Sequence, residues 1–64
     1  MRVNGAEIAK GSLCTLMEFL VREGYPVGRI AVEKNGRIVP RAQYGDEALS
    51  ESDRLEIVAF VGGG

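Results

Sequence analysis

The most reactive group predicted from this sequence lies at its end, where Phe60 and Val61 are followed by three glycines, 62–64. Glycine has no Cβ and cannot contribute to a core, so such a run is a thin thread tipped by a carboxylate. An apolar, strand-like run, 55–61, precedes it without a polar spacer. This end predicts a carrier whose reactive group is the carboxyl of Gly64, activated by another enzyme. The alternative interpretation is a frayed terminus or a cloning remnant.

The rest of the chain offers few residues for catalysis. There is no histidine to activate the single cysteine, Cys14, and a lone cysteine makes no metal site. A buried or half-buried apolar role is predicted for it instead. The acidic pairs at 46–47 and at 51 and 53 are interpreted as solvated loop charges. We therefore expect no catalytic residues, no metal site and no enzyme activity.

Composition narrows the class of protein. The 64 residues suffice for one small domain, and the net charge of −1, with both signs interspersed, argues against a nucleic-acid surface. No stretch has the length of a membrane span, and no signal peptide opens the chain. A single cysteine excludes an internal disulfide, which favours the cytoplasm.

Two Asn-Gly pairs, Asn4-Gly5 and Asn35-Gly36, predict tight hairpin turns. In the second hairpin, a two-residue turn places Val32 opposite Val39. The predicted strands are 1–4, 6–9, 30–34 and 37–39.

Between the hairpins, Thr15 and Glu18 form a capping-box pattern that starts a helix. Leu16, Phe19 and Leu20 follow at helical spacing, and Gly24 and Pro26 end the pattern.

Residues 41–52 are predicted to be irregular, with Tyr44 and Leu49 anchored in the core. The last strand, 55–61, then places Leu55, Ile57 and Ala59 on its inner face. The simplest closed arrangement sets the first and last strands side by side and parallel. This predicts an α+β β-grasp (ubiquitin-like) domain over 1–61, with a four- to five-stranded mixed sheet, one main helix on one face, and a glycine tail, 62–64.

Four segments of the chain are similar to one known family: residues 3–5, 15–20, 32–44 and 53–64. The most specific are the run Val39-Pro40-Arg41 with Tyr44 behind it, and the Phe-Val-Gly-Gly-Gly end. The chain resembles the ThiS family, the ubiquitin-like sulfur carriers of thiamine biosynthesis. It departs from the family at Ser52, where Gly-Asp is frequent before the last strand.

The resemblance implies a mechanism and partners. A ThiF-like enzyme consumes ATP to adenylate Gly64, a sulfur-donating enzyme converts it to a thiocarboxylate, and a ThiG-like thiazole synthase receives the sulfur. Gly62 and Gly63 guide the tail into these active sites, and the chain itself holds no stably bound cofactor. Carriers for molybdopterin synthesis or another thiolation pathway, and ubiquitin-like protein modifiers, remain alternatives.

The last strand also predicts a docking surface. Val58 and Phe60 alternate with the inward residues, so they lie on the opposite face of the strand and, with Val61, form an apolar surface beside the tail. We expect a partner to bind there. Alternatively, Phe60 folds over the sheet edge or covers Tyr44.

Overall fold

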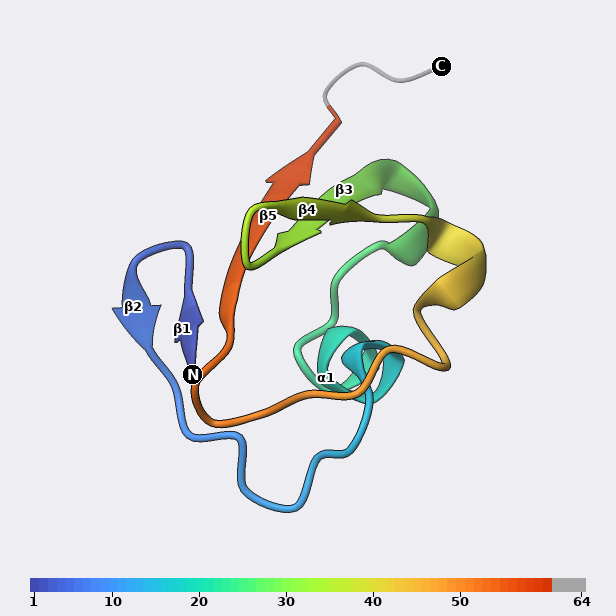
Figure 1. Ribbon diagram of the computed structural model, residues 1–64. Coiled ribbons are helices and arrows are strands. Elements are labelled where there is room, and N and C mark those ends of the chain that lie inside the picture. Colours follow the sequence, from blue (N-terminus) through green and yellow to red (C-terminus); the bar gives the residue numbers. More distant parts are fainter. Residues whose placement is uncertain (61–64) are drawn as a thin grey trace.

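The computed structural model describes residues 1–60, in which one helix packs on one side of a five-stranded sheet (Figure 1). The strand order is β2-β1-β5-β3-β4, with β1 and β5 parallel and the other pairs antiparallel. This confirms the α+β β-grasp prediction. The elements are β1 (Arg2–Val3), β2 (Ala6–Glu7), α1 (Leu16–Arg22), η1 (Val27–Arg29), β3 (Ile30–Lys34), β4 (Arg37–Val39), η2 (Arg41–Gln43) and β5 (Arg54–Ala59). The predicted boundary between domain and tail, after residue 61, lies outside the described residues.

Both hairpin turns adopt the backbone that the Asn-Gly pairs predict. Asn4 and Gly5 have φ values of 50° and 86°, and Asn35 and Gly36 have 54° and 84°. Positive φ at both central residues defines the type I′ turn, whose twist matches that of the flanking strands. The predicted register, with Val32 opposite Val39, is confirmed.

The two turn asparagines also hold β5 in the middle of the sheet. The Asn4 Oδ1 accepts a hydrogen bond from the Ile57 backbone N–H at 2.7 Å, and its Nδ2 donates to the Ile57 carbonyl at 3.2 Å. The Asn35 Oδ1 accepts from the Arg54 N–H at 2.9 Å. Each asparagine side chain thereby supplies hydrogen-bond partners to backbone groups of β5, in addition to the bonds between the strands.

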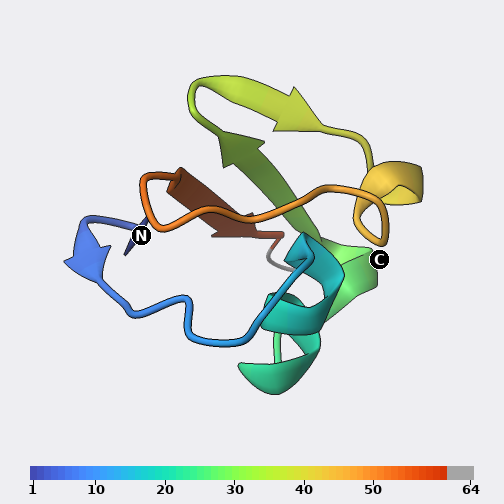
Figure 2. The ribbon, with the colours of Figure 1, turned by 60° about the horizontal axis from the view of Figure 1, so that its bottom comes forward.

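The helix begins with the predicted capping box. The Thr15 Oγ1 accepts from the Glu18 N–H at 3.2 Å, and the Glu18 Oε1 accepts from the Thr15 N–H at 2.8 Å. Its inner side, formed by Leu16, Phe19 and Leu20, is fully buried in the hydrophobic core. Figure 2 shows α1 on one side of the sheet. The helix stops at Arg22, and Gly24 follows with a φ of 75°, a conformation that glycine adopts without strain.

The capping box predicts a loss of stability in acid. Hydrogen bonds from the Cys14 and Thr15 N–H groups hold the pKa of Glu18 below its usual 4.5. A lowered pKa means that this contribution is present above pH 4.5 and is lost as the pH falls through the native pKa. We expect Glu18→Gln, which keeps an uncharged acceptor, to show a shallower fall in melting temperature below pH 4.5. Parallel curves for the two proteins would contradict this.

The segment between β4 and β5 is irregular apart from η2, and it closes the core. Tyr44 and Leu49 are buried, as predicted. Ala59 lies on the inner face of β5 as predicted, opposite the buried Ile30, but its own side chain is exposed. The physical reason is the length of the helix: β5 runs past α1 (Figure 1), so the helix does not reach the end of the strand.

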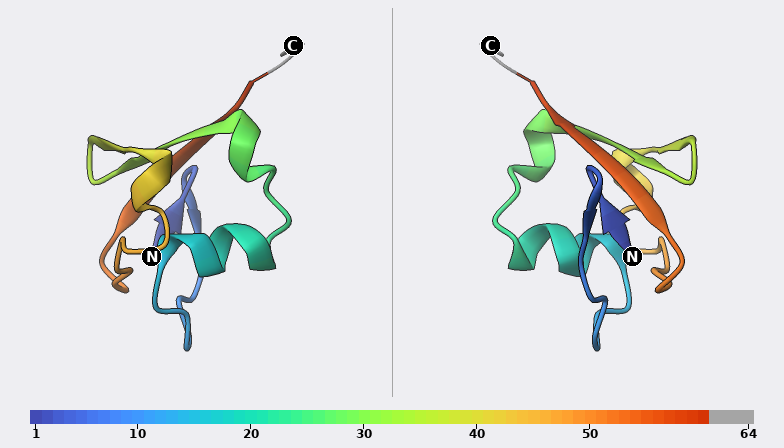
Figure 3. Two further views of the ribbon diagram at one scale, coloured as in Figure 1. Left: turned by 90° about the vertical axis from the view of Figure 1, so that its right-hand side faces the viewer. Right: turned by 90° about the vertical axis from the view of Figure 1, so that its left-hand side faces the viewer.

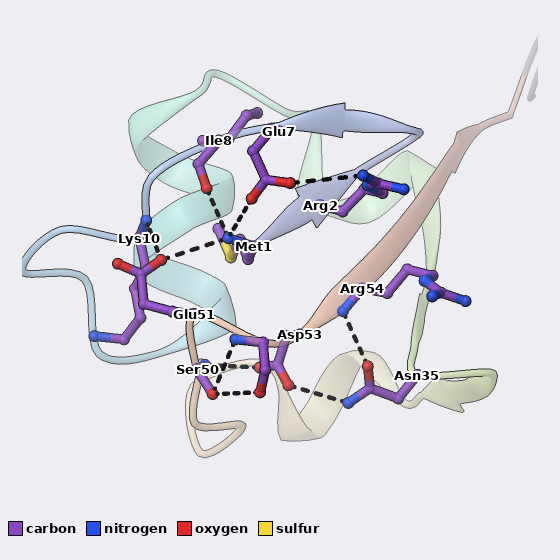
Figure 4. A network of polar contacts seen from close by, with 11 residues as sticks. Met1, Arg2, Glu7, Ile8, Lys10, Asn35, Ser50, Glu51, Asp53 and Arg54 are labelled. Atoms are coloured by element: carbon purple, nitrogen blue, oxygen red, sulfur yellow. Dashed lines mark hydrogen bonds and ion pairs between the residues drawn. The ribbon is translucent and has the colours of Figure 1, made fainter.

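One acidic side chain before β5 is structural. Asp53 is only 6% exposed, so its interpretation as a solvated loop charge is wrong. Its carboxylate accepts hydrogen bonds from the Ser50 N–H at 2.7 Å and the Asn35 Nδ2 at 3.0 Å, so it needs no water (Figure 4). Nearby, the Lys34 Nζ donates to the Glu47 carboxylate at 2.8 Å, and that bond raises the pKa of Lys34. These contacts fix the start of β5.

Candidate functional site

The candidate site begins at the end of β5, where the chain continues toward the glycine tail. Beyond the last residue of β5, the Phe60 N–H donates to the Arg29 carbonyl at 2.8 Å, so the chain is still anchored at residue 60. Figure 3 shows β5 running away from α1 toward this end. The predicted site residues that follow, Val61 and Gly62–Gly64, lie outside the described residues.

The two faces of β5 differ as its alternation predicts. Leu55 and Ile57 are buried in the core, whereas Val58 is 60% exposed and Phe60 is 56% exposed. We call the side of the sheet turned away from α1 the outer face. Of the three predicted docking residues, the structure thus exposes the two that it describes, Val58 and Phe60. Their contact with a partner stays a prediction.

A further apolar residue, Ile38, belongs to this surface and was not predicted from the sequence. It is 73% exposed and pairs with Glu33, which also lies on the outer face. The hairpin register contained the signal, because placing Val32 and Val39 inward leaves their neighbours outward. We call Ile38, Val58 and Phe60 together the apolar patch.

Neither a metal-binding cluster nor a membrane-spanning helix is found among the described residues. Among residues 1–60, no group of three or more His, Cys, Asp or Glu side chains is arranged to hold a metal ion. Within the same part of the chain, no helix is long and apolar enough to cross a membrane. The cytoplasmic location stays a prediction.

The prediction for Cys14 is wrong, because its side chain is exposed. It lies just before the N-cap Thr15, where its backbone N–H donates to the Glu18 Oε1 at 2.7 Å. The capping box thus fixes the backbone of Cys14, and no element covers its thiol. The Sγ lies 3.6 Å from the Ser12 carbonyl.

We expect Cys14→Ser to be loaded with sulfur as fast as the wild type, because the sequence has no histidine that could activate this thiol. The melting temperature should also stay nearly the same, since an exposed side chain is replaced by one of similar size. Mass spectrometry over a loading time course, with thermal unfolding as the folding control, checks both. Complete loss of loading in a folded variant would make Cys14 a sulfur relay.

Comparison with solved structures supports the fold assignment. The chain superimposes with a TM-score of 0.81 on the crystal structure of a thiamine biosynthesis protein (ThiS) from Geobacter metallireducens, at 26% identity, covering 98% of this chain and 96% of that one. The solution structure of a thiamine biosynthesis protein from the same organism gives a TM-score of 0.77, at 26% identity, with 98% and 85% covered.

Among curated proteins, the chain is similar to part of two thiazole synthases. It is 40% identical over 62 residues to that of Paramagnetospirillum magneticum, covering 97% of this chain and 19% of that protein. It is 42% identical over 50 residues to that of Magnetococcus marinus, covering 78% and 15%. The chain thus spans less than a fifth of the length of these relatives. The model of the ThiS family matches residues 2–64, and the chain therefore belongs to the ThiS family, the sulfur carriers of thiamine biosynthesis, which are not themselves enzymes.

Proposed function

We propose that the chain carries sulfur as a thiocarboxylate on the carboxyl group of Gly64 and donates it for the thiazole moiety of thiamine. The observation that carries this proposal is the extent of the family match, which runs through the glycine end to residue 64. The anchoring of Phe60 supports it, because a tail that starts from a held strand has a defined point of departure.

The proposed chemistry proceeds in two displacements. The Gly64 carboxylate attacks the α-phosphorus of ATP on an adenylating enzyme, which forms an acyl adenylate and releases pyrophosphate. A sulfide equivalent from a sulfur-donating enzyme then attacks the carbonyl carbon. The C–S bond forms as the C–O bond to AMP breaks, and a thiocarboxylate results. The anionic sulfur of the thiocarboxylate is the nucleophile that is then donated to the acceptor.

The three glycines suit a tail that must enter more than one active site. In extended form they span about 10 Å, enough to separate the carboxyl from the domain surface. Without Cβ atoms, Gly62 and Gly63 pass through narrow channels. Ordering each residue costs roughly 1–2 kcal/mol, so the partner must offset this with backbone hydrogen bonds and with contacts to the domain.

Two partners complete the proposal. An ATP-dependent, ThiF-like enzyme adenylates the tail, and a ThiG-like thiazole synthase accepts the sulfur. The similarity to part of two much longer proteins named thiazole synthase supports the second partner, because a domain of this kind is covalently joined to further sequence there. No cofactor is proposed to stay bound to this chain, since ATP is consumed by the adenylating enzyme.

The test is sulfur loading followed by transfer. The full chain is incubated with the adenylating enzyme, ATP and a sulfur source, and its intact mass is measured. We expect one oxygen to be replaced by sulfur, only when ATP is present. The loaded protein is then given to thiazole synthase with its other substrates, and thiazole should form. A chain that is never loaded, or that joins instead to a lysine of another protein, would contradict the proposal.

A further inference from the structure

The outer face carries a pair of acidic side chains between its apolar residues. Its side chains form two adjacent rows that run across the strands. The first row contains Glu56 on β5, Glu33 on β3 and Ile38 on β4. The second row contains Val58 on β5 and Ala31 on β3. The rows are two residues apart along each strand, about 7 Å. Glu33 therefore lies in the middle of this surface, with Ile38 and Glu56 on either side.

Glu33 and Glu56 are directly opposite each other in the β3–β5 pair. Side chains in such positions have Cβ atoms about 4.5–5.5 Å apart, and like charges there are destabilising. None of the ion pairs found among residues 1–60 includes either glutamate. Arg54 lies on the same face, two residues before Glu56, but it forms no ion pair with either glutamate. No described ion pair therefore offsets the repulsion that this register predicts for the free domain.

A partner that binds the apolar patch must also deal with these charges. Ile38 and Val58 belong to the two rows, so a surface that covers both also covers Glu33 and removes water from its carboxylate. Burying two unpaired carboxylates is strongly unfavourable, and a cation placed between them reverses the sign of the interaction. A guanidinium suits this position better than an ammonium, because its planar set of donors reaches two carboxylates at once.

We propose that Glu33 and Glu56 together bind an arginine side chain of the adenylating enzyme. This inference rests on the proposed function, which requires that enzyme to hold the domain while the tail occupies its active site. The apolar patch supplies contact area, and the acidic pair fixes the orientation of the sheet, so that β5 leads the tail toward the site of adenylation.

The test uses the full chain with Glu33→Gln, Glu56→Gln and the double substitution, titrated against the purified adenylating enzyme at low and high salt. We expect each single change to weaken binding about tenfold or more, and the salt dependence of the affinity to decrease. Asp46→Asn is the matched control, because it removes one negative charge from the segment after η2 and should leave the affinity nearly unchanged.

Thermal unfolding of the free variants gives the second measurement. Because the substitutions relieve a repulsion, the melting temperature of Glu33→Gln should rise while its affinity falls. An unchanged affinity, or a lower melting temperature that accounts for weaker binding, would overturn the inference. The outcome is separable from the proposed function: wild-type chain that is loaded with sulfur, beside glutamine variants that bind equally well, contradicts the acidic pair alone.

Discussion

Deletion of Gly64 is expected to abolish thiocarboxylate formation completely and to leave the domain folded. The proposed activated group is the carboxyl of this residue, and the shortened tail brings the new terminus about 3.5 Å short of the reacting phosphate. An in-line displacement does not tolerate a gap of this size, since reacting atoms must approach to about 3–3.5 Å. Intact-mass measurement after incubation with the adenylating enzyme, ATP and a sulfur source checks the loss.

The control for this deletion is the fold of the shortened protein. All residues of the core lie between Met1 and Ile57, so the melting temperature should match that of the wild type. Gly64→Ala keeps the chain length and tests the width of the channel separately. If the deletion variant still exchanged one oxygen for sulfur at its new end, Gly64 would not be the specific attachment point.

Phe60→Ala is expected to weaken binding to the adenylating enzyme by more than tenfold. The ring is 56% exposed beside the start of the tail, and it lies on a backbone that is held to Arg29. Truncating an aromatic residue at the centre of an interface typically costs at least about 2 kcal/mol, and about 1.4 kcal/mol corresponds to a factor of ten in affinity. Because the ring is outside the buried core, the free energy of unfolding should change little.

A binding titration and thermal unfolding together separate docking from folding. Val21→Ala is the matched control, because Val21 is an exposed apolar residue, at 66%, but lies on α1 rather than on the sheet. It should bind normally. A large drop in melting temperature for Phe60→Ala with unchanged affinity would assign Phe60 to the fold and remove it from the docking surface.

The order and type of the main elements could be predicted from the sequence because their signals are local. An Asn-Gly pair favours positive φ at two consecutive residues wherever it occurs, and both hairpins formed as expected. The capping box likewise involves only Thr15, Glu18 and the backbone between them. The short 3₁₀ turns η1 and η2 carried no comparable signal and were not predicted.

The sequence by itself thus determined the hairpins, the helix start, the alternation along β5 and the resemblance to the ThiS family. Only the tertiary structure decided that Cys14 and Ala59 are exposed, that Asp53 is buried, and that two glutamates are opposite each other. The physical reason is that local conformation depends on neighbours in the chain, whereas burial and cross-strand pairing depend on which distant element lies alongside. β3 and β5 are about twenty residues apart in sequence, and only their pairing register sets Glu33 against Glu56.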